Sequence, residues 1–230
     1  MKNAIIKNNK LYIPAQPEKI FRKLKKKDLA GFPLKEKALH LATQAHDGQY
    51  RKSEPTVPYI VHPIEVASIL IEEGFGGDNG LIMAALLHDV VEDTPYTLKE
   101  LRDIFGDDVA RLISCATENK SLSWEDRKLE KIGTVRGLLP REKRVIIADE
   151  IANLSSLKKE FDVLGRRDFS LYSRGEEQQK WKFRGMMESL MFNNGDSRSL
   201  LERLERSYNN IFSDDAKFGF MKGRDIRHYE

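Results

Sequence analysis

Apolar residues recur at helical spacing along most of this sequence from residue 35 onward. Ala38, Leu39, Ala42 and Ala45 share one face of a predicted helix that ends at Gly48, because residues three or four apart lie on the same side of an α-helix. Strand signals are sparse beyond the N-terminal segment, so the pattern predicts an all-α fold. The same reasoning predicts further helices over residues 63–74, 81–93, 97–105, 107–117, 123–139, 141–161, 175–192 and 197–212.

Local signals mark where several of these helices begin and end. Pro63 stands where a helix can begin, and Gly74 stands where that helix can end. The third helix stops before Pro95, because the residue before a proline disfavours helical geometry. Thr97, with Glu100 three residues later, has the pattern of a capping box that opens the next helix.

The N-terminal segment has a different character. Residues 10–17 read K-L-Y-I-P-A-Q-P, where two prolines and alternating apolar positions indicate an extended arm or a short strand. The basic run at residues 22–27 lies beside Ile20 and Phe21, which favours a solvated helical face over a binding patch. We expect an arm and basic lead-in at residues 1–30, one domain at residues 31–215 and a polar tail at residues 216–230.

Length and composition narrow the class of protein. A chain of 230 residues is long enough for one domain with an appendage and too short for two full domains. Its 39 basic and 36 acidic residues give a formal charge of +3, which does not indicate nucleic-acid binding. The single cysteine, Cys115, excludes an internal disulfide and a cysteine-rich zinc site. No apolar run approaches the roughly 18 residues of a membrane span, and residues 1–14 lack a secretory signal, so we expect a cytoplasmic protein.

The most informative segment is A-A-L-L-H-D-V-V-E-D-T, at residues 84–94. His88, Asp89, Glu92 and Asp93 fall within six positions of an otherwise apolar helix. If these groups are buried they need partners, and a metal ion is one such partner. His88 and Glu92 are four residues apart, as are Asp89 and Asp93, so both pairs project from one surface. That surface is suited to hold a cation and a catalytic acid together.

Two other segments supply further candidate ligands. His62 lies in P-Y-I-V-H-P just before a predicted helix start, and Asp149 lies four residues before Asn153 in I-A-D-E-I-A-N. Together with His88 and Asp89 they provide two imidazoles and two carboxylates. Such mixed ligation suits Mn²⁺, Fe²⁺ or another six-coordinate divalent ion with positions open for water and phosphate oxygen. Zinc fits less well, because structural zinc prefers a closed tetrahedral site that is richer in Cys and His.

The order H…HD…D, with H-D-x-x-E-D at its centre, resembles the HD superfamily, specifically the RelA/SpoT-type hydrolase domain of alarmone-metabolising enzymes and its small stand-alone relatives. The resemblance covers about residues 35–161 and extends more weakly to residue 212. It includes A-H-D-G-Q-Y-R-K at 45–52, P-Y-I-V-H-P-I-E-V-A at 58–67, F-G-D-D-V-A at 105–110 and T-E-N-K-S-L at 117–122.

This resemblance implies a fold and a role for each candidate residue. The fold is a single HD-domain helical bundle with a short extended N-terminal arm. The implied metal ligands are His62, His88, Asp89 and Asp149; the residues that orient or deprotonate the attacking water are Glu92 and Asp93; and the substrate-binding residues are Arg51, Lys52 and Asn153.

The implied activity is removal of the 3′-pyrophosphate from guanosine tetra- or pentaphosphate with Mn²⁺. The chain lacks the synthetase domain of the long bifunctional members, so the resemblance implies a hydrolase only. Two other functions stay open: a phosphatase of another phosphorylated nucleotide such as NADPH, and a nucleotide-binding regulator with weak turnover. The expected partner is a small-molecule nucleotide, with neither nucleic acid nor membrane, and the sequence does not specify an oligomeric partner.

One departure from the family pattern concerns Glu150 and Ala152, which stand where a basic residue and a larger ring are usual. If the Glu150 carboxylate faces the pocket, it disfavours highly charged substrates, and Glu150→Lys should tighten the binding of guanosine tetraphosphate. If Glu150 points outward, it is a surface residue. Among the remaining polar and aromatic residues, His46 is expected to have a structural role, Lys120, Arg127 and Lys128 to be solvated, and Trp124, Trp181 and Phe183 to pack.

Overall fold

The computed structural model describes residues 5–7, 10–12, 33–52 and 54–212. In these segments the fold is all-α apart from one short hairpin, as predicted. The hairpin consists of β1 (Ile5–Lys7) and β2 (Lys10–Tyr12). The helices are α2 (Pro33–Ala45), α3 (Val61–Leu70), α4 (Asn79–Leu87), α5 (Val90–Asp93), α6 (Leu98–Phe105), α7 (Asp107–Ala116), α8 (Trp124–Arg136), α9 (Pro140–Leu164), α10 (Glu176–Met191) and α11 (Arg198–Asn209).

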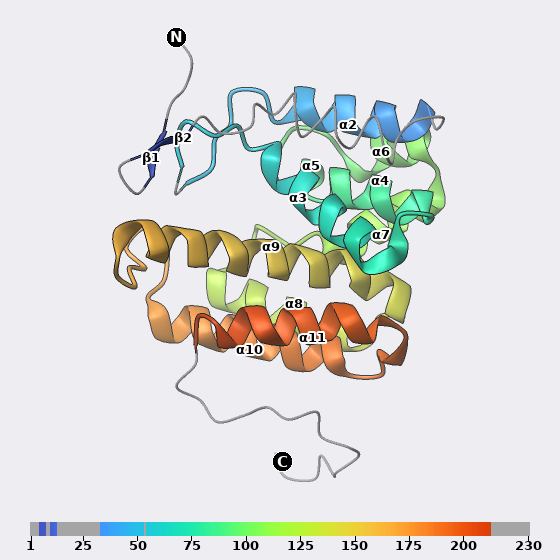
Figure 1. Cartoon of the computed structure of the whole chain (residues 1–230). Coiled ribbons are helices and arrows are strands. Elements are labelled where there is room, and N and C mark those ends of the chain that lie inside the picture. The colour runs from blue at the N-terminus through green and yellow to red at the C-terminus, as the bar shows by residue number, and fades with distance from the viewer. Residues whose placement is uncertain (1–4, 8–9, 13–32, 53, 213–230) are drawn as a thin grey trace.

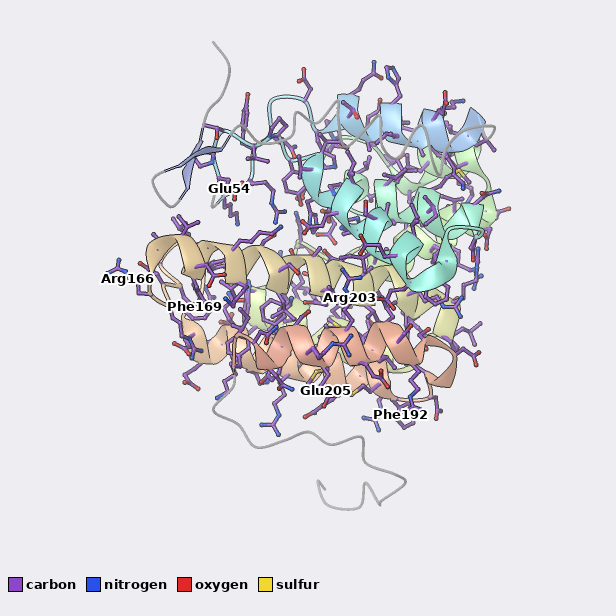
Figure 2. All side chains as sticks on the ribbon, viewed as in Figure 1. Glu54, Arg166, Phe169, Phe192, Arg203 and Glu205 are labelled. Atoms are coloured by element: carbon purple, nitrogen blue, oxygen red, sulfur yellow. The ribbon has the colours of Figure 1, made fainter. Side chains whose placement is uncertain are left out.

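The long helix α9 lies across the middle of the bundle (Figure 1). On one side it packs against α3, α4 and α7, and on the other side against α10 and α11. Figure 2 shows Phe169 in the layer between α9 and α10. The ring of Phe169 lies 5.1 Å from that of Phe161 on α9 and 6.3 Å from that of Phe212 after α11. Aromatic side chains therefore fill the space between these helices.

The N-terminal hairpin agrees with the extended conformation expected from residue 10 onward. Strand β2 pairs with β1 in antiparallel register, with Ile6 opposite Leu11. Residues 13–17 of the predicted arm, the basic run at 22–27 and the predicted tail at 216–230 lie outside the described residues. The predicted domain boundaries also fall there.

Helix α4 forms the centre of the first half of the bundle. Every residue from 81 to 87 is buried, with exposed fractions of 4% or less. A helix that is apolar on all sides must be surrounded by other elements, and α4 contacts α2, α3, α7 and α9. Its first turn is capped by Asp78, whose side chain accepts a hydrogen bond from the backbone N–H of Leu81 at 3.0 Å.

Two predicted helix boundaries are wrong. The helix predicted over residues 81–93 is divided into α4 and α5, because Asp89 has φ −90° and ψ −10° and interrupts the regular pattern. The helix predicted over residues 63–74 begins at Val61, and it ends at Leu70 in a π turn over residues 71–75. Within that turn Gly74 has φ 90°, a conformation that L side chains rarely adopt. The predicted capping box of α6 is confirmed.

A buried lysine joins three helices behind the cavity described below. The side chain of Lys143 on α9 is fully buried, and its Nζ donates to the backbone carbonyls of Arg136, Ser189 and Phe192 at 3.3, 3.1 and 2.6 Å. These carbonyls lie at the C-terminal ends of α8 and α10, where the helix dipole favours a positive charge. Burial, followed by the charge of Arg136, lowers the pKa of Lys143. No helix in the described part of the chain is long and apolar enough to cross a membrane.

We expect Lys143→Met to lower the free energy of unfolding by about 2–4 kcal/mol, because it leaves buried carbonyl groups without a donor. Lys158→Met is the matched control, since Lys158 is a partly exposed lysine of the same helix whose salt bridge, among the described residues, is with Asp162, and it should change stability by less than about 0.5 kcal/mol. Urea unfolding followed by circular dichroism measures both values. Equal effects of the two substitutions would contradict the role assigned to Lys143.

Candidate active site

Four predicted ligands come together from three parts of the fold. His62 lies in the first turn of α3, His88 and Asp89 lie between α4 and α5, and Asp149 lies in the middle of α9. His62 Nε2 is 2.9 Å from Asp149 Oδ1 and 3.6 Å from Asp89 Oδ2. His88 Nε2 is 3.1 Å from Asp89 Oδ2 and 3.6 Å from Asp149 Oδ1. The structure therefore gathers all four side chains, while their role as ligands stays a prediction.

The arrangement of these groups fits a divalent metal ion. His62 and His88 are buried, and one ligand atom from each of His62, His88 and Asp149 lies within 4.8 Å of the others. His88 Nδ1 lies 2.9 Å from the carbonyl oxygen of Ala85, which can only accept a hydrogen bond. The proton of a neutral imidazole is therefore on Nδ1, and the lone pair of Nε2 faces the carboxylates. Nε2 has no hydrogen-bond partner among the described residues, which is expected of a metal ligand.

The electrostatics of the four side chains also favour a cation. Burial lowers the pKa of His88, but the charges of Asp89 and Asp149 outweigh that effect and raise this pKa well above 6.5. Burial raises the pKa of Asp149, yet His62 and His88 bring it well below its ordinary value. The buried carboxylates thus require nearby positive charge, which either protonated imidazoles or a bound metal ion can supply.

Tyr59 is a site residue that the sequence reasoning missed. Its hydroxyl donates a 2.6 Å hydrogen bond to Asp89 Oδ2, and its ring lies edge-on to His62 at 5.8 Å. Burial, then the charge of Asp89, raises the pKa of Tyr59 far above 10, so it remains a donor at all physiological pH values. The signal was its place in P-Y-I-V-H-P, three residues before His62. Tyrosine is not a usual metal ligand, so its residue type alone does not predict a place in a metal site.

Glu92 and Asp93 line the same cavity beside this centre. Glu92 Oε1 accepts a 2.5 Å hydrogen bond from the backbone N–H of Glu118. Lys120 pairs with Asp93 and lies 3.6 Å from Glu92 Oε2. Burial raises the pKa of Glu92 to about 7. A carboxyl group with that pKa exchanges protons near neutral pH, as a general acid or base must.

The predicted substrate-binding residues lie on the cavity wall, and two of them have partners. Arg51 Nη2 donates to Ser156 Oγ at 2.7 Å, and Asn153 Nδ2 donates to Asp149 Oδ1 at 2.8 Å. Lys52 lines the cavity with them, and the cavity volume is about 360 Å³. The structure thus places all three beside the candidate metal centre.

Several residues expected on the surface instead line this cavity. Lys120 pairs with Asp93, while Arg127 and Lys128 pair with Glu118 at 2.8 and 2.6 Å. Lys120 is exposed, as expected, whereas Arg127 and Lys128 are only 20% and 14% exposed, so the expectation that they are solvated is wrong. Helical spacing alone does not show which carboxylate a neighbouring loop supplies. Trp124 and Phe183 also line the cavity. As expected, these rings pack, Trp124 against Trp181 at 6.2 Å and Phe183 against Phe212 at 6.1 Å.

Glu150 lines the cavity, as the first of the two interpretations of the sequence expected. It is 4% exposed, so it does not point outward, and its Oε2 accepts a 2.6 Å hydrogen bond from Lys182 Nζ on α10. The carboxylate is therefore neutralised rather than left to repel phosphate. The expected effect of Glu150→Lys stays a prediction. In that variant the new ammonium group would take the place of the carboxylate that pairs with Lys182.

His46 has the structural role that was expected. It is 2% exposed, and its Nδ1 lies 2.9 Å from Gln49 Oε1. Gln49 in turn donates to the backbone carbonyl of Asp93 at 2.8 Å. This pair connects the loop that carries Arg51 to the end of α5.

Comparison with known proteins agrees with this geometry. A helical bundle that gathers two imidazoles and two carboxylates at the wall of a cavity is the arrangement of a metal-dependent hydrolase. The family model described as HD domain matches residues 38–170. The chain belongs to the HD-domain family.

Curated relatives include guanosine-3′,5′-bis(diphosphate) 3′-pyrophosphohydrolase MESH1 of Danio rerio, which is 40% identical over 121 residues. That match covers 53% of this chain and 67% of the relative. The bifunctional (p)ppGpp synthase/hydrolase SpoT of Escherichia coli is 38% identical over 123 residues, which cover 51% of this chain and 17% of the relative.

Two solved structures have the same fold. One is a Listeria monocytogenes protein with a TM-score of 0.62 and 38% identity, and the match covers 66% of this chain and 99% of that one. The other is a metazoan orthologue of SpoT that hydrolyses ppGpp, with a TM-score of 0.64 and 30% identity. That match covers 76% of this chain and 94% of the other.

We expect Tyr59→Phe to weaken Mn²⁺ binding by about 10- to 100-fold, because loss of the hydroxyl leaves Asp89 without the donor that orients it. The thermal midpoint should change little. The control is Tyr50→Phe at an exposed tyrosine of the same loop region. Isothermal titration calorimetry with Mn²⁺ measures both affinities, and an unchanged affinity in Tyr59→Phe would show that its hydroxyl does not orient a ligand.

Proposed function

We propose that this protein is a guanosine-3′,5′-bis(diphosphate) 3′-pyrophosphohydrolase that uses Mn²⁺. The observation that carries the proposal is the cluster of two histidines and two aspartates beside Glu92, at the wall of a cavity that six basic residues help to line. The resemblance to MESH1 and to the metazoan SpoT orthologue supports the guanosine substrate. The mixed nitrogen and oxygen donors support Mn²⁺ over zinc.

The charge of the cavity suits an anionic substrate once an ion is bound. The side chains that line it include equal numbers of acidic and basic residues, so the wall is close to neutral. A divalent ion makes the site positive and favourable for a phosphorylated nucleotide. The basic residues are Arg51, Lys52, Lys120, Arg127, Lys128 and Lys182, and the acidic residues are Asp89, Glu92, Asp93, Glu118, Asp149 and Glu150.

The residues of the chain have distinct parts in the proposed reaction. His62, His88, Asp89 and Asp149 would hold the ion, which lowers the pKa of water and polarises a phosphoryl oxygen when bound. Glu92 Oε1 is fixed by the backbone of Glu118, so Oε2 is the atom that takes the proton of the attacking water.

Two basic residues and the side-chain amide of Asn153 complete the proposed site. Arg51 and Lys52 bind phosphate oxygens, and Asn153 binds near the ribose. The amide of Asn153 is oriented by its hydrogen bond to Asp149. The products are a guanosine nucleotide with a free 3′-hydroxyl and pyrophosphate.

We expect the metal-free protein to release no pyrophosphate from guanosine tetraphosphate and Mn²⁺ to restore the activity. Asp149→Ala should lose bound Mn²⁺, whereas Asp162→Ala, at an exposed position of the same helix, should retain it. Pyrophosphate and phosphate release from a nucleotide panel that includes NADPH, together with metal analysis, makes the test. Full turnover by the metal-free protein, or release from NADPH alone, would contradict the proposal.

Glu92→Gln separates binding from chemistry. We expect this variant to bind Mn²⁺ and nucleotide normally and to lose about 10²- to 10⁴-fold in kcat, because it cannot accept a proton. Stopped-flow turnover and Mn²⁺ titration give the two values. If the bound metal is lost together with the activity, Glu92 is a ligand rather than the acid–base residue.

A further inference from the structure

Two basic side chains from other elements contact helix α9 at separate positions along the cavity. Asp149 and Glu150 lie beside the candidate metal centre, and Ser156 lies six residues further along the helix, which corresponds to about 9 Å at 1.5 Å per residue. Arg51 donates a hydrogen bond to Ser156, whereas Lys182 donates one to Glu150. One basic group therefore lies beside the metal centre, and another lies toward the far end of the cavity.

The lysine beside the metal centre has hydrogen-bonding capacity left over. Lys182 is 7% exposed, lines the cavity, and its Nζ lies 3.9 Å from the centre of the Phe183 ring. An ammonium group has three N–H donors, and Glu150 takes one of them at 2.6 Å. Within the described part of the chain, that is the only hydrogen bond of this ammonium group.

A second ammonium group lies close to Lys182. Lys128 on α8 also lines the cavity, and after burial the nearby charge of Lys182 is the next largest influence that lowers its pKa. Glu118 holds Lys128 through both carboxylate oxygens, at 2.6 and 2.8 Å. Two lysines from different helices are thus each paired with one carboxylate on the wall of the cavity that also holds the candidate metal ligands.

We propose that Lys182, positioned by Glu150 and flanked by Lys128, binds the terminal phosphate of the diphosphate that is removed, and that it makes the enzyme selective for diphosphate over monophosphate groups. This inference rests on the proposed function. Lys182 is the specificity-determining residue, and Glu150 acts through it as a positioning residue. The buried ion pair keeps the ammonium group at one place, where a solvated lysine would sample many rotamers.

Binding of inorganic pyrophosphate and of inorganic phosphate to the Mn²⁺-loaded protein tests this inference without turnover. By isothermal titration calorimetry, Lys182→Met should weaken pyrophosphate binding by about 10- to 100-fold and phosphate binding by less than about threefold, since a charge-assisted hydrogen bond to the terminal group is lost. Lys182→Arg should retain most of the pyrophosphate affinity, and Lys158→Met on the exposed side of α9 should bind as the wild type does. Equal losses for the two anions, or no loss, would overturn the proposal.

The exchange of the two charges keeps the test decisive if Lys182→Met does not fold. Glu150→Lys combined with Lys182→Glu retains a buried ion pair and a cation beside Asp149, so it should bind pyrophosphate better than Glu150→Gln alone. Thermal melting and Mn²⁺ content confirm that the compared variants are folded and loaded. A folded, loaded exchange variant with no better pyrophosphate affinity than Glu150→Gln would count against the proposal.

Hydrolysis distinguishes this inference from the proposed function. If wild-type protein releases no pyrophosphate from guanosine tetraphosphate, the proposed function fails, whatever the binding data show. If it does release pyrophosphate, Lys182→Met should raise KM more than it lowers kcat, and the loss should be smaller for a guanosine nucleotide with a 3′-monophosphate. An equal loss of kcat/KM for both substrates would leave the proposed function intact and would show that Lys182 does not determine specificity.

Discussion

The packing of Asp89 and Asp149 against two buried imidazoles is the constraint on which the rest of the structure depends. Two partly buried carboxylates so close together are unstable unless positive charge lies next to them. The fold places His62 Nε2 2.9 Å from Asp149 and His88 Nε2 3.1 Å from Asp89, and the Tyr59 hydroxyl donates to Asp89. A divalent ion satisfies all of these groups at once. Stability of the site and metal-dependent chemistry therefore have the same physical origin.

Helix α9 connects this centre to the rest of the molecule. Its N-terminal part carries Lys143, which caps the ends of α8 and α10, and its middle carries Asp149 and Glu150. About two turns after Asp149, Ser156 accepts a hydrogen bond from Arg51 of the loop before α3. Because a single rigid helix bears these contacts, the metal centre and the basic groups on both sides of it keep a fixed spacing.

Sequence reasoning succeeded where the signal is local and failed where it depends on tertiary contacts. The capping box of Thr97 and Glu100 could be predicted from the sequence because both residues belong to one helical turn. The gathering of His62, His88, Asp89 and Asp149 was foreseen from the ordered resemblance to the HD superfamily and from their chemistry.

The contacts of Tyr59 and Lys182 were not foreseen. Tyr59 and Asp89 are 30 residues apart in the sequence, and Lys182 and Glu150 are 32 apart. Contacts between such distant residues depend on tertiary packing, so no local pattern predicts them. The interruption at Asp89 was missed because its backbone stays close to helical geometry and preserves the apolar pattern on both sides.

The most direct test of the central claim is anomalous diffraction from crystals of this protein grown with Mn²⁺. The account predicts one strong peak within bonding distance of His62, His88, Asp89 and Asp149, with both imidazole Nε2 atoms directed at it. Imidazoles hydrogen-bonded directly to the carboxylates, with no anomalous peak between them, would contradict the account.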